Sequence, residues 1–322
     1  MSGSRRSRAI GMLILATPCW AVSFPVTKAL VLEQQRLLPD AGSWFLTGLD
    51  VMVRFGLAGL LLFPLLLFRG QMISRRELEQ GIVLAFFGGA GILFQMDGLA
   101  YTAASTSAFL TQGYTVFIPM WVMLTTGRRP SLKVIMCVAL VLAGVAKLAD
   151  LHWNALKFGR GELETIIASL FFTAQILTLE QPRYATSRPM QFSIAMFLAM
   201  ALFSLPLVWV TAPSVTACLH GFDSASACGF MAALIVICTL AGYILMNCWQ
   251  RQVTATEAGL IYCIEPVCAS ALALFLPAWF STWAGIDYPD ELVTSRLVIG
   301  GMLVTAANLL LQTPWLEPKR VA

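Results

Sequence analysis

The stretch SWFLTGLDVMVRFGLAGLLLFPLLLF, residues 43–68, decides the fold because its apolar character continues almost without interruption. A bilayer with a hydrocarbon core of roughly 30 Å needs about 20 residues of helix to span it, and this stretch is long enough. A membrane-spanning barrel would instead show alternating segments of about ten residues. Residues 43–68 are therefore predicted to form a transmembrane helix.

Comparable stretches fill nearly the whole chain of 322 residues, so we expect an all-α membrane protein. Hydrophobic residues make up 58% of the sequence, charged residues only 12%, and the mean hydropathy is +0.77. A soluble fold has too little polar surface at this composition. The ten predicted spans are Ala9–Val31, Ser43–Phe68, Gly81–Ala100, Ala103–Thr125, Leu132–Leu148, Leu163–Leu179, Gln191–Val210, Gly229–Trp249, Thr254–Pro277 and Ser295–Gln312.

The basic residues predict the orientation of these spans. Most of the 21 Lys and Arg residues fall at the N-terminus, at the C-terminus and in alternate connecting segments. Short loops rich in Lys and Arg stay in the cytoplasm, so both termini are predicted to be cytoplasmic. The net charge of +4 is explained by these residues, which can meet anionic lipid, and no nucleic-acid partner is needed.

Two cysteines share one predicted outer loop. Cys218 and Cys228 both lie between the seventh and eighth spans. They would pair if this loop faces an oxidising periplasm, and otherwise they are two free thiols. The sequence leaves both alternatives open.

A weak internal repeat divides the chain into residues 1–150 and 151–322. Residues 106–110 align with residues 256–260 at an offset of 150, which also places Asp97 on Asn247. An offset of 152 places Trp20 on Phe172. Each half holds five spans, an odd number, so the second half would enter the membrane from the opposite side, as in transporters built from inverted repeats. Chance similarity among apolar helices is the alternative.

Four motifs resemble the EamA-type transporters of the drug/metabolite transporter superfamily. They are WAVSFPVTK at residues 20–28, RFGLAGLLL at 54–62, YTAASTSAFLTQGYTVFIP at 101–119 and TATEAGLIYCIEPVCA at 254–269. The resemblance covers nearly the full length, and it implies a ten-helix inner-membrane carrier with a central cavity that often exports amino acids or other small metabolites. This chain has Thr115-Val116 where an equivalent Glu-Pro can occur, and Arg128-Arg129 where a Glu is common. These departures argue against proton coupling through the fourth span.

Ionisable residues inside the predicted spans are the main functional candidates, because each costs about 2.5–3.5 kcal/mol to insert. Arg54 and Glu265 lie near mid-depth, so we expect them to pair. Lys28 and Asp97 lie near the outer ends of their helices and predict a second pair. A fixed salt bridge between helices is the alternative for each. Outside these pairs, Glu180 is expected to bind Arg183, and Glu257 is expected to cap its own helix.

Glu265 is the strongest single candidate. Pro266 removes a backbone donor, which loosens the helix and frees carbonyl groups to bind a cation or an amine. Tyr262 precedes Glu265 by three residues, so both lie on one helix face. We hypothesise that Glu265 binds the amino group of a substrate or exchanges a proton during transport.

Polar and aromatic residues within the spans complete a predicted substrate cavity. Neutral hydrogen-bonding groups orient a polar solute without trapping it, although the same groups also join helices at about 0.6 kcal/mol each. The predicted cavity residues are Trp20, Arg54, Gln95, Asp97, Thr111, Gln112, Tyr114, Asn247, Tyr262 and Glu265.

The sequence contains no motif for an enzyme. GxxxxGK[ST], HExxH and GxSxG are all absent, and the acidic residues are too scattered to hold a metal. We therefore expect a non-enzymatic secondary transporter, without cofactor, that moves a small polar or amphipathic metabolite, as an exporter by alternating access. Its partners are a small-molecule substrate, the bilayer and an exchangeable proton. The sequence does not identify the substrate, establish the direction of transport or predict the oligomeric state. A membrane-embedded enzyme acting on a lipid intermediate and a non-transporting sensor or scaffold are the alternatives.

Overall fold

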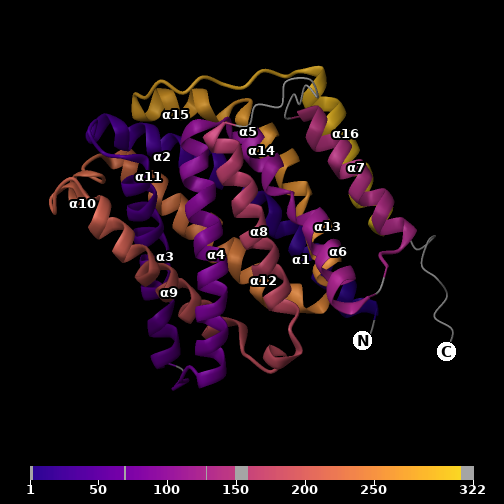
Figure 1. The fold of residues 1–322 in the computed structure, drawn as a ribbon. Helices are drawn as coiled ribbons and strands as arrows, with labels where there is room; N and C mark the ends of the chain where they lie inside the picture. The colour runs from indigo at the N-terminus through magenta and orange to yellow at the C-terminus, as the bar shows by residue number, and fades with distance from the viewer. Residues whose placement is uncertain (1–2, 69, 128, 149–158, 313–322) are drawn as a thin grey trace.

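A computed structural model describes residues 3–68, 70–127, 129–148 and 159–312, which form one helical bundle without strands (Figure 1). The helices of the first half are α1 (Gly3–Ala21), α2 (Ser23–Leu37), α3 (Ser43–Phe68), α4 (Arg75–Tyr101), α5 (Ala104–Thr111), α6 (Tyr114–Thr126) and α7 (Leu132–Leu148). The second half contains α8 (Arg160–Glu180), η1 (Pro182–Tyr184), α9 (Pro189–Thr211), α10 (Ala217–His220), α11 (Ala225–Ala233), η2 (Leu234–Tyr243), α12 (Ile244–Trp249), η3 (Gln250–Gln252), α13 (Ala255–Tyr262), α14 (Ile264–Ala273), α15 (Leu276–Ala284) and α16 (Ser295–Gln312).

Fewer helices meet a strict test for a membrane span than the ten predicted. Seven stretches of the described residues are long and apolar enough, and a bent pair, residues 255–273 with α15 at 54°, would make eight. Two further apolar helices, Leu132–Gly144 within α7 and Val298–Ala307 within α16, are shorter. The multi-pass membrane architecture is confirmed, whereas ten crossings and the sidedness of the termini stay predictions.

Several predicted spans are single stretches made of two or more helices. Residues 5–37 hold α1 and α2, residues 104–126 hold α5 and α6, and residues 225–252 hold α11, η2, α12 and η3. The predicted ninth span does not run straight to Pro277, because the chain bends after Leu274 into α15. Helix α15 then lies across one end of the bundle (Figure 1).

This end, where α3 and α8 begin, is called the α15 end below. The opposite end is where α4 and α9 begin. Trp279 and Trp283 of α15 stack with ring centroids 6.4 Å apart and are 62% and 50% exposed. Exposed tryptophans are typical of a membrane interface, so α15 has the character of an interfacial helix.

Capping boxes begin two of the helices. Ser74 and Glu77 exchange side-chain hydrogen bonds with each other's backbone at the start of α4, and Thr254 and Glu257 do the same at the start of α13. Each box satisfies two backbone donors that a helix start leaves unpaired. The predicted capping role of Glu257 is confirmed, whereas Glu180 does not bind Arg183. Glu180 instead accepts the backbone N–H of Ala255 at 2.9 Å, and Arg183 pairs with Glu79.

Glycines bring α4 against its neighbours. A side chain at Gly81 would place its Cβ 2.5 Å from the Cβ of Ala195 on α9, and one at Gly161 on α8 would lie 2.6 Å from the carbonyl oxygen of Gly98. Neither position tolerates a larger residue without movement of backbone. Small residues of this kind let helices approach closely in a membrane.

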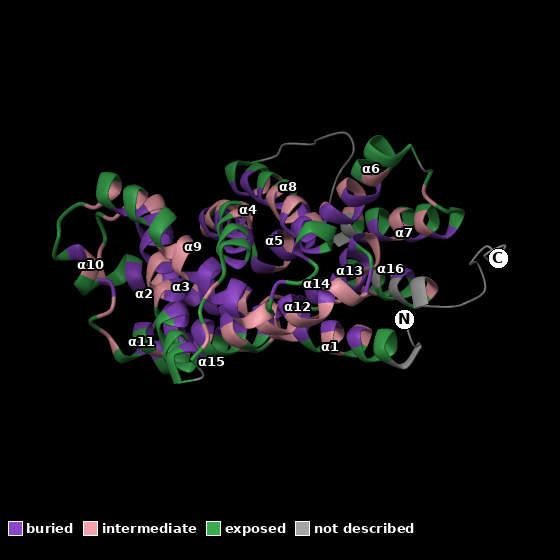
Figure 2. Cartoon of the chain, turned by 90° about the horizontal axis from the view of Figure 1, so that it is seen from below, coloured by how far each residue is buried: buried purple, intermediate pink, exposed green. Residues whose placement is uncertain are grey.

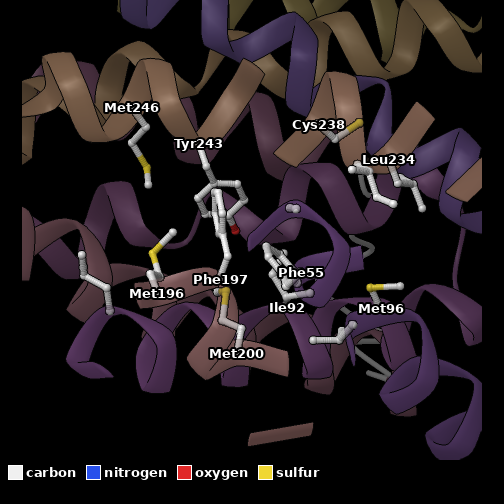
Figure 3. Close-up of a cluster of buried hydrophobic side chains, with 14 of the residues drawn as sticks. Phe55, Ile92, Met96, Met196, Phe197, Met200, Leu234, Cys238, Tyr243 and Met246 are labelled. Carbon is white, nitrogen blue, oxygen red and sulfur yellow. The ribbon is translucent and has the colours of Figure 1, made fainter. Parts of the chain in front are cut away.

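Buried residues face the centre of the bundle, whereas exposed residues lie mostly at its periphery (Figure 2). Phe55, Phe197 and Tyr243 form a central aromatic group from α3, α9 and η2, with ring centroids 5.8–6.0 Å apart (Figure 3). The periphery carries large exposed apolar side chains, such as Leu67 at 60% and Leu202 at 62%. Apolar residues outside and polar residues inside are the arrangement that a lipid solvent favours.

Candidate functional site

A cavity of about 60 Å³ lies between the two halves of the chain. Its lining residues are Trp20, Ser23, Arg54, Ile92, Gln95, Thr111, Tyr114, Phe172, Gln175, Ile176, Tyr243, Met246, Tyr262 and Glu265. Seven of the ten predicted cavity residues are among them; Asp97, Gln112 and Asn247 are not.

Most lining residues fall into pairs separated by the repeat distance. Twelve of the fourteen form six pairs at offsets of 151 or 152, and only Arg54 and Ile176 have no partner within the lining. The pairs are Trp20 with Phe172, Ser23 with Gln175, Ile92 with Tyr243, Gln95 with Met246, Thr111 with Tyr262 and Tyr114 with Glu265. The two halves thus contribute corresponding positions to one cavity.

Interrupted helices surround this cavity. Helix α1 gives way to α2 at Val22, α5 ends before Gln112 and Gly113, and α13 ends before Cys263. The fourth interruption is η2, a π-helix that contributes Tyr243. Broken helices and π segments occur frequently at transport and ligand sites, because they leave backbone groups unpaired.

Glu265 lies in the first turn of α14 and is 7% exposed. The carbonyl of Tyr262, four residues before Pro266, receives no helical N–H because proline has none. The predicted loosening of the helix near this proline is confirmed as a break at Cys263, three residues before Pro266.

Arg54 lines the same cavity from α3, but it does not form the predicted salt bridge. Its Nε donates a 2.7 Å hydrogen bond to Thr239 Oγ1, and no ion pair with Glu265 occurs among the described residues. The guanidinium also lies 5.2 Å from the centroid of the Phe55 ring. Arg54 and Glu265 therefore line one cavity as a basic and an acidic group that do not contact each other.

Aromatic rings form one wall of the cavity. Trp20 makes edge contacts with Tyr262, at 5.1 Å between ring centroids, and with Tyr243 at 5.9 Å. The hydroxyl of Tyr262 donates to Gln250 Oε1 at 2.9 Å, which fixes the ring. Trp20 Nε1 is buried and has no hydrogen-bond partner among the residues that the structure describes.

The predicted pair of Lys28 with Asp97 is wrong. Lys28 Nζ donates to the carbonyl of Leu99 at 2.8 Å and to that of Thr102 at 3.3 Å. Asp97 instead pairs with Arg160 at the start of α8. The carbonyls at the end of α4 compete for the ammonium group, because four of them lack a helical partner there.

The two other predicted residues outside the cavity form hydrogen bonds elsewhere, Asn247 between two helices and Gln112 at the end of α5. Asn247 Nδ2 donates to Ser193 Oγ at 2.8 Å, which joins α12 to α9. Gln112 Nε2 donates to the carbonyl of Ala108 at 3.3 Å. For Asn247 the alternative of an interhelical hydrogen bond is what the structure shows.

Charged pairs close the bundle at both ends. At the α15 end, Arg160 binds Asp97, Glu164 at 2.8 Å and the hydroxyl of Tyr101 at 2.7 Å. At the opposite end, Arg188 Nε donates to Glu77 Oε1 at 2.7 Å, and these hydrogen bonds raise the pKa of Arg188. The pairs join α4 to α8 and α4 to α9, so each end has its own connection.

Sequence reasoning missed several residues of this region. Phe172 was within reach, because the repeat alignment already placed Trp20 on it. Asp50 is an ionisable residue inside a predicted span and was overlooked, and it is fully buried. Glu164, the second residue of the predicted span Leu163–Leu179, was overlooked in the same way. The described residues contain no cluster of acids, histidines or cysteines that fits a metal, and Cys218 and Cys228 are free thiols.

Comparison with known proteins gives a family and a fold. Residues 7–149 match the EamA-like transporter family. A solved structure titled "Crystal structure of protein" is 17% identical, with a TM-score of 0.62, and the match covers 95% of this chain and 98% of that one. No curated protein matches the sequence. The family match confirms the predicted resemblance, and the structural match shows the fold alone.

Proposed function

We propose that this chain, whose residues 7–149 belong to the EamA-like transporter family, is a secondary transporter that moves an amino acid or a related small metabolite by alternating access. The family supports a membrane transporter of the drug/metabolite transporter superfamily. The substrate class rests on the cavity, because Glu265 and Arg54 offer opposite charges there without pairing. A zwitterion carries the complementary amine and carboxylate.

Binding in this proposal uses charge at two points and aromatic contact between them. The carboxylate of Glu265 accepts the amine of the substrate, and the guanidinium of Arg54, which has free N–H groups besides Nε, donates to its carboxylate. Trp20 and Tyr243 contact the side chain of the substrate. Desolvation inside the cavity strengthens both charged hydrogen bonds relative to water.

The inverted repeat, with its halves at residues 1–150 and 151–322, is the second part of the proposal. It is supported by the six lining pairs and by helix packing, since α3 packs along α9, α7 along α16, α5 against α14 and α6 against α13. The first two contacts join corresponding helices of the two halves. The last two are counterparts of each other, because α5 corresponds to α13 and α6 to α14. Lys28 and Glu180, which correspond at an offset of 152, bind the turns before α5 and α13 respectively.

In this proposal, the charged contacts of Arg160 at the α15 end and the Glu77–Arg188 pair at the opposite end are gates that open in turn during alternating access. Breaking the Arg160 contacts would separate α4 from α8 at the α15 end, and breaking Glu77–Arg188 would separate α4 from α9 at the other. We place the chain in the inner membrane with both termini in the cytoplasm, as the basic residues indicate. Export is the proposed direction, on the strength of the family resemblance.

A ligand screen followed by an exchange assay tests this function. Purified protein is heated with single amino acids, nucleosides, vitamins and amphipathic drugs, because a ligand of the folded state raises its stability by mass action. Amino acids are expected to give the largest shifts, and those that bind should exchange across liposomes that contain the protein. Stabilisation by none of these classes, or binding without exchange, would contradict the proposal. Formation of a product from a lipid would favour an enzyme instead.

A further inference from the structure

A buried acid and a buried amide meet on α2 and α3, the helices that carry Ser23 and Arg54 of the cavity lining. Asp50 on α3 and Gln34 on α2 are both 0% exposed. Gln34 Nε2 donates a 2.7 Å hydrogen bond to Asp50 Oδ1. The other oxygen of each group, Asp50 Oδ2 and Gln34 Oε1, is buried and has no partner among the described residues.

Two acceptor oxygens without a donor are costly in a dry interior. Both belong to groups that already share one hydrogen bond. A single proton on Asp50 Oδ2 that is donated to Gln34 Oε1 would satisfy both oxygens and close a ring of two hydrogen bonds between acid and amide. A carboxylate at Asp50 would leave both oxygens unpaired and bury a negative charge.

No cation in direct contact neutralises Asp50. Arg54 is one helical turn along α3, and its charge acts on Asp50, but its Nε hydrogen bond goes to Thr239. On α2, Glu33 is bound to Ser226 on α11 and to Arg36. Helix η2 adds the thiol of Cys238 and the phenol of Tyr243 near Arg54, and α9 adds the apolar Leu207 and Val208 against Gly48.

We propose that Asp50 and Gln34 form a proton-binding site that controls where Arg54 points. With the proton on Asp50, Arg54 faces the cavity and is available to an anionic group. When the proton leaves Asp50 Oδ2 for water, the new carboxylate attracts the guanidinium one turn away and withdraws it from the cavity. The proton site exists independently of any substrate, whereas its link to transport rests on the proposed function.

Proton binding at Asp50 and substrate binding at Arg54 strengthen each other. A proton on Asp50 keeps Arg54 available to the substrate carboxylate, and by thermodynamic linkage the bound carboxylate raises the affinity of Asp50 for the proton by the same factor. The proton and the substrate therefore cross together. Export by this route runs down the concentration gradient of the solute itself, and an inward proton gradient drives uptake.

Infrared spectroscopy tests the proton site without a substrate. Purified protein with ¹³C at the aspartate carboxyl should show, at neutral pH, a protonated-carboxyl band that moves with the label. The band should be absent from Asp50→Asn and retained in the matched variant Asp97→Asn. Absence of a label-sensitive band from the unaltered protein, or its persistence in Asp50→Asn, would overturn the proposal. If Asp50→Asn does not fold, Gln34→Leu decides: it must shift the band, and an unshifted band overturns the site.

A liposome assay tests the link to transport with the amino acid that gives the largest stabilisation in the screen above. Asp50→Asn should exchange this amino acid between equal pools at nearly the rate of the unaltered protein. It should lose the acceleration of uptake that an inward proton gradient produces. Acceleration that survives in Asp50→Asn, or that is absent from the unaltered protein, refutes the link. Failure of the unaltered protein to exchange contradicts the proposed function instead and leaves the infrared result standing.

Discussion

The α5–α6 and α13–α14 segments have the same architecture but different charge. Each begins with an eight-residue helix, Ala104–Thr111 or Ala255–Tyr262, and each is interrupted beside the cavity. The second segment carries Glu265 and Pro266 after its break, whereas the first carries the neutral Tyr114 and Thr115. The two segments thus bring similar helix breaks to one cavity, and of their lining residues only Glu265 of the second segment is an acid.

The largest effect is expected from removing that charge. Glu265→Gln should slow exchange of a bound amino acid about thirty-fold or more, because truncating one partner of a buried charged hydrogen bond costs about 2–5 kcal/mol. Thr115→Val, next to the aligned Tyr114 of the first segment, is the matched control and should change the rate less than about threefold, since Thr115 Oγ1 donates only to the carbonyl of Gln112. Equal losses in both variants would show that the halves share the binding role.

The charged pairs at the two ends of the bundle allow a second comparison, between the two proposed gates. Arg160→Gln leaves the buried carboxyls of Asp97 and Glu164 without their cation. The contact between α4 and α8 at the α15 end should then weaken by about 2 kcal/mol. Labelling by a water-soluble thiol reagent of a cysteine placed at Ser23, which lines the cavity, should then rise from that end. Arg188→Gln, the matched variant, should raise labelling from the opposite end. If both variants raised labelling of this cysteine from the same side of the membrane, the two pairs would not be separate gates.

The helix breaks at Gly113 and Cys263 differ in how tightly neighbouring side chains pack against them. A Cβ at Gly113 would lie 2.8 Å from Ser169 Oγ and 3.2 Å from the Phe117 ring, so Gly113→Ala should lower the free energy of unfolding by about 1–3 kcal/mol. Cys263→Ala, at the corresponding break, removes only a buried thiol and should cost about 1 kcal/mol or less. Thermal unfolding of the two variants measures the difference. A Gly113→Ala protein as stable as Cys263→Ala would show that the first break is not tightly packed.

The smallest effect is expected at the aromatic wall. Trp20→Phe keeps an aromatic ring at the position that pairs with Phe172, and the edge contact with Tyr262 is worth about 0.5–1.5 kcal/mol. Affinity for the amino acid should fall less than about tenfold, as measured by titration calorimetry. Trp20→Ala should lose more, and an unchanged affinity in Trp20→Ala would remove the ring from the binding site.

The sequence predicted the spans and part of the cavity because these depend on local properties. Hydropathy over about 20 residues locates a span, and helical spacing placed Tyr262 and Glu265 on one face. Trp20, Gln95 and Thr111 also proved to line the cavity. Whether these residues bind a substrate stays a prediction.

The wrong predictions concern two kinds of contact. One depends on how a helix is rotated about its axis, and the other depends on which of several groups binds a charged side chain. The π-helix η2 rotates by a smaller angle per residue than an α-helix. Tyr243 at its end and Met246 after it line the cavity, whereas Asn247 contacts Ser193. Depth alone paired Lys28 with Asp97, although the carbonyls at the end of α4 and Arg160 were the stronger partners. Neither outcome follows from spacing along the chain.

Opposed insertion of the two halves is the central claim, and sided labelling tests it most directly. Met72→Cys lies between α3 and α4, and Asp223→Cys lies 151 positions later between α10 and α11, and both native residues are exposed. Each is introduced into a protein without its eight native cysteines and treated with a membrane-impermeant maleimide on intact, uniformly oriented vesicles. Labelling of one position only from outside and of the other only from inside is the predicted result. Labelling of both from the same side would contradict the inverted repeat.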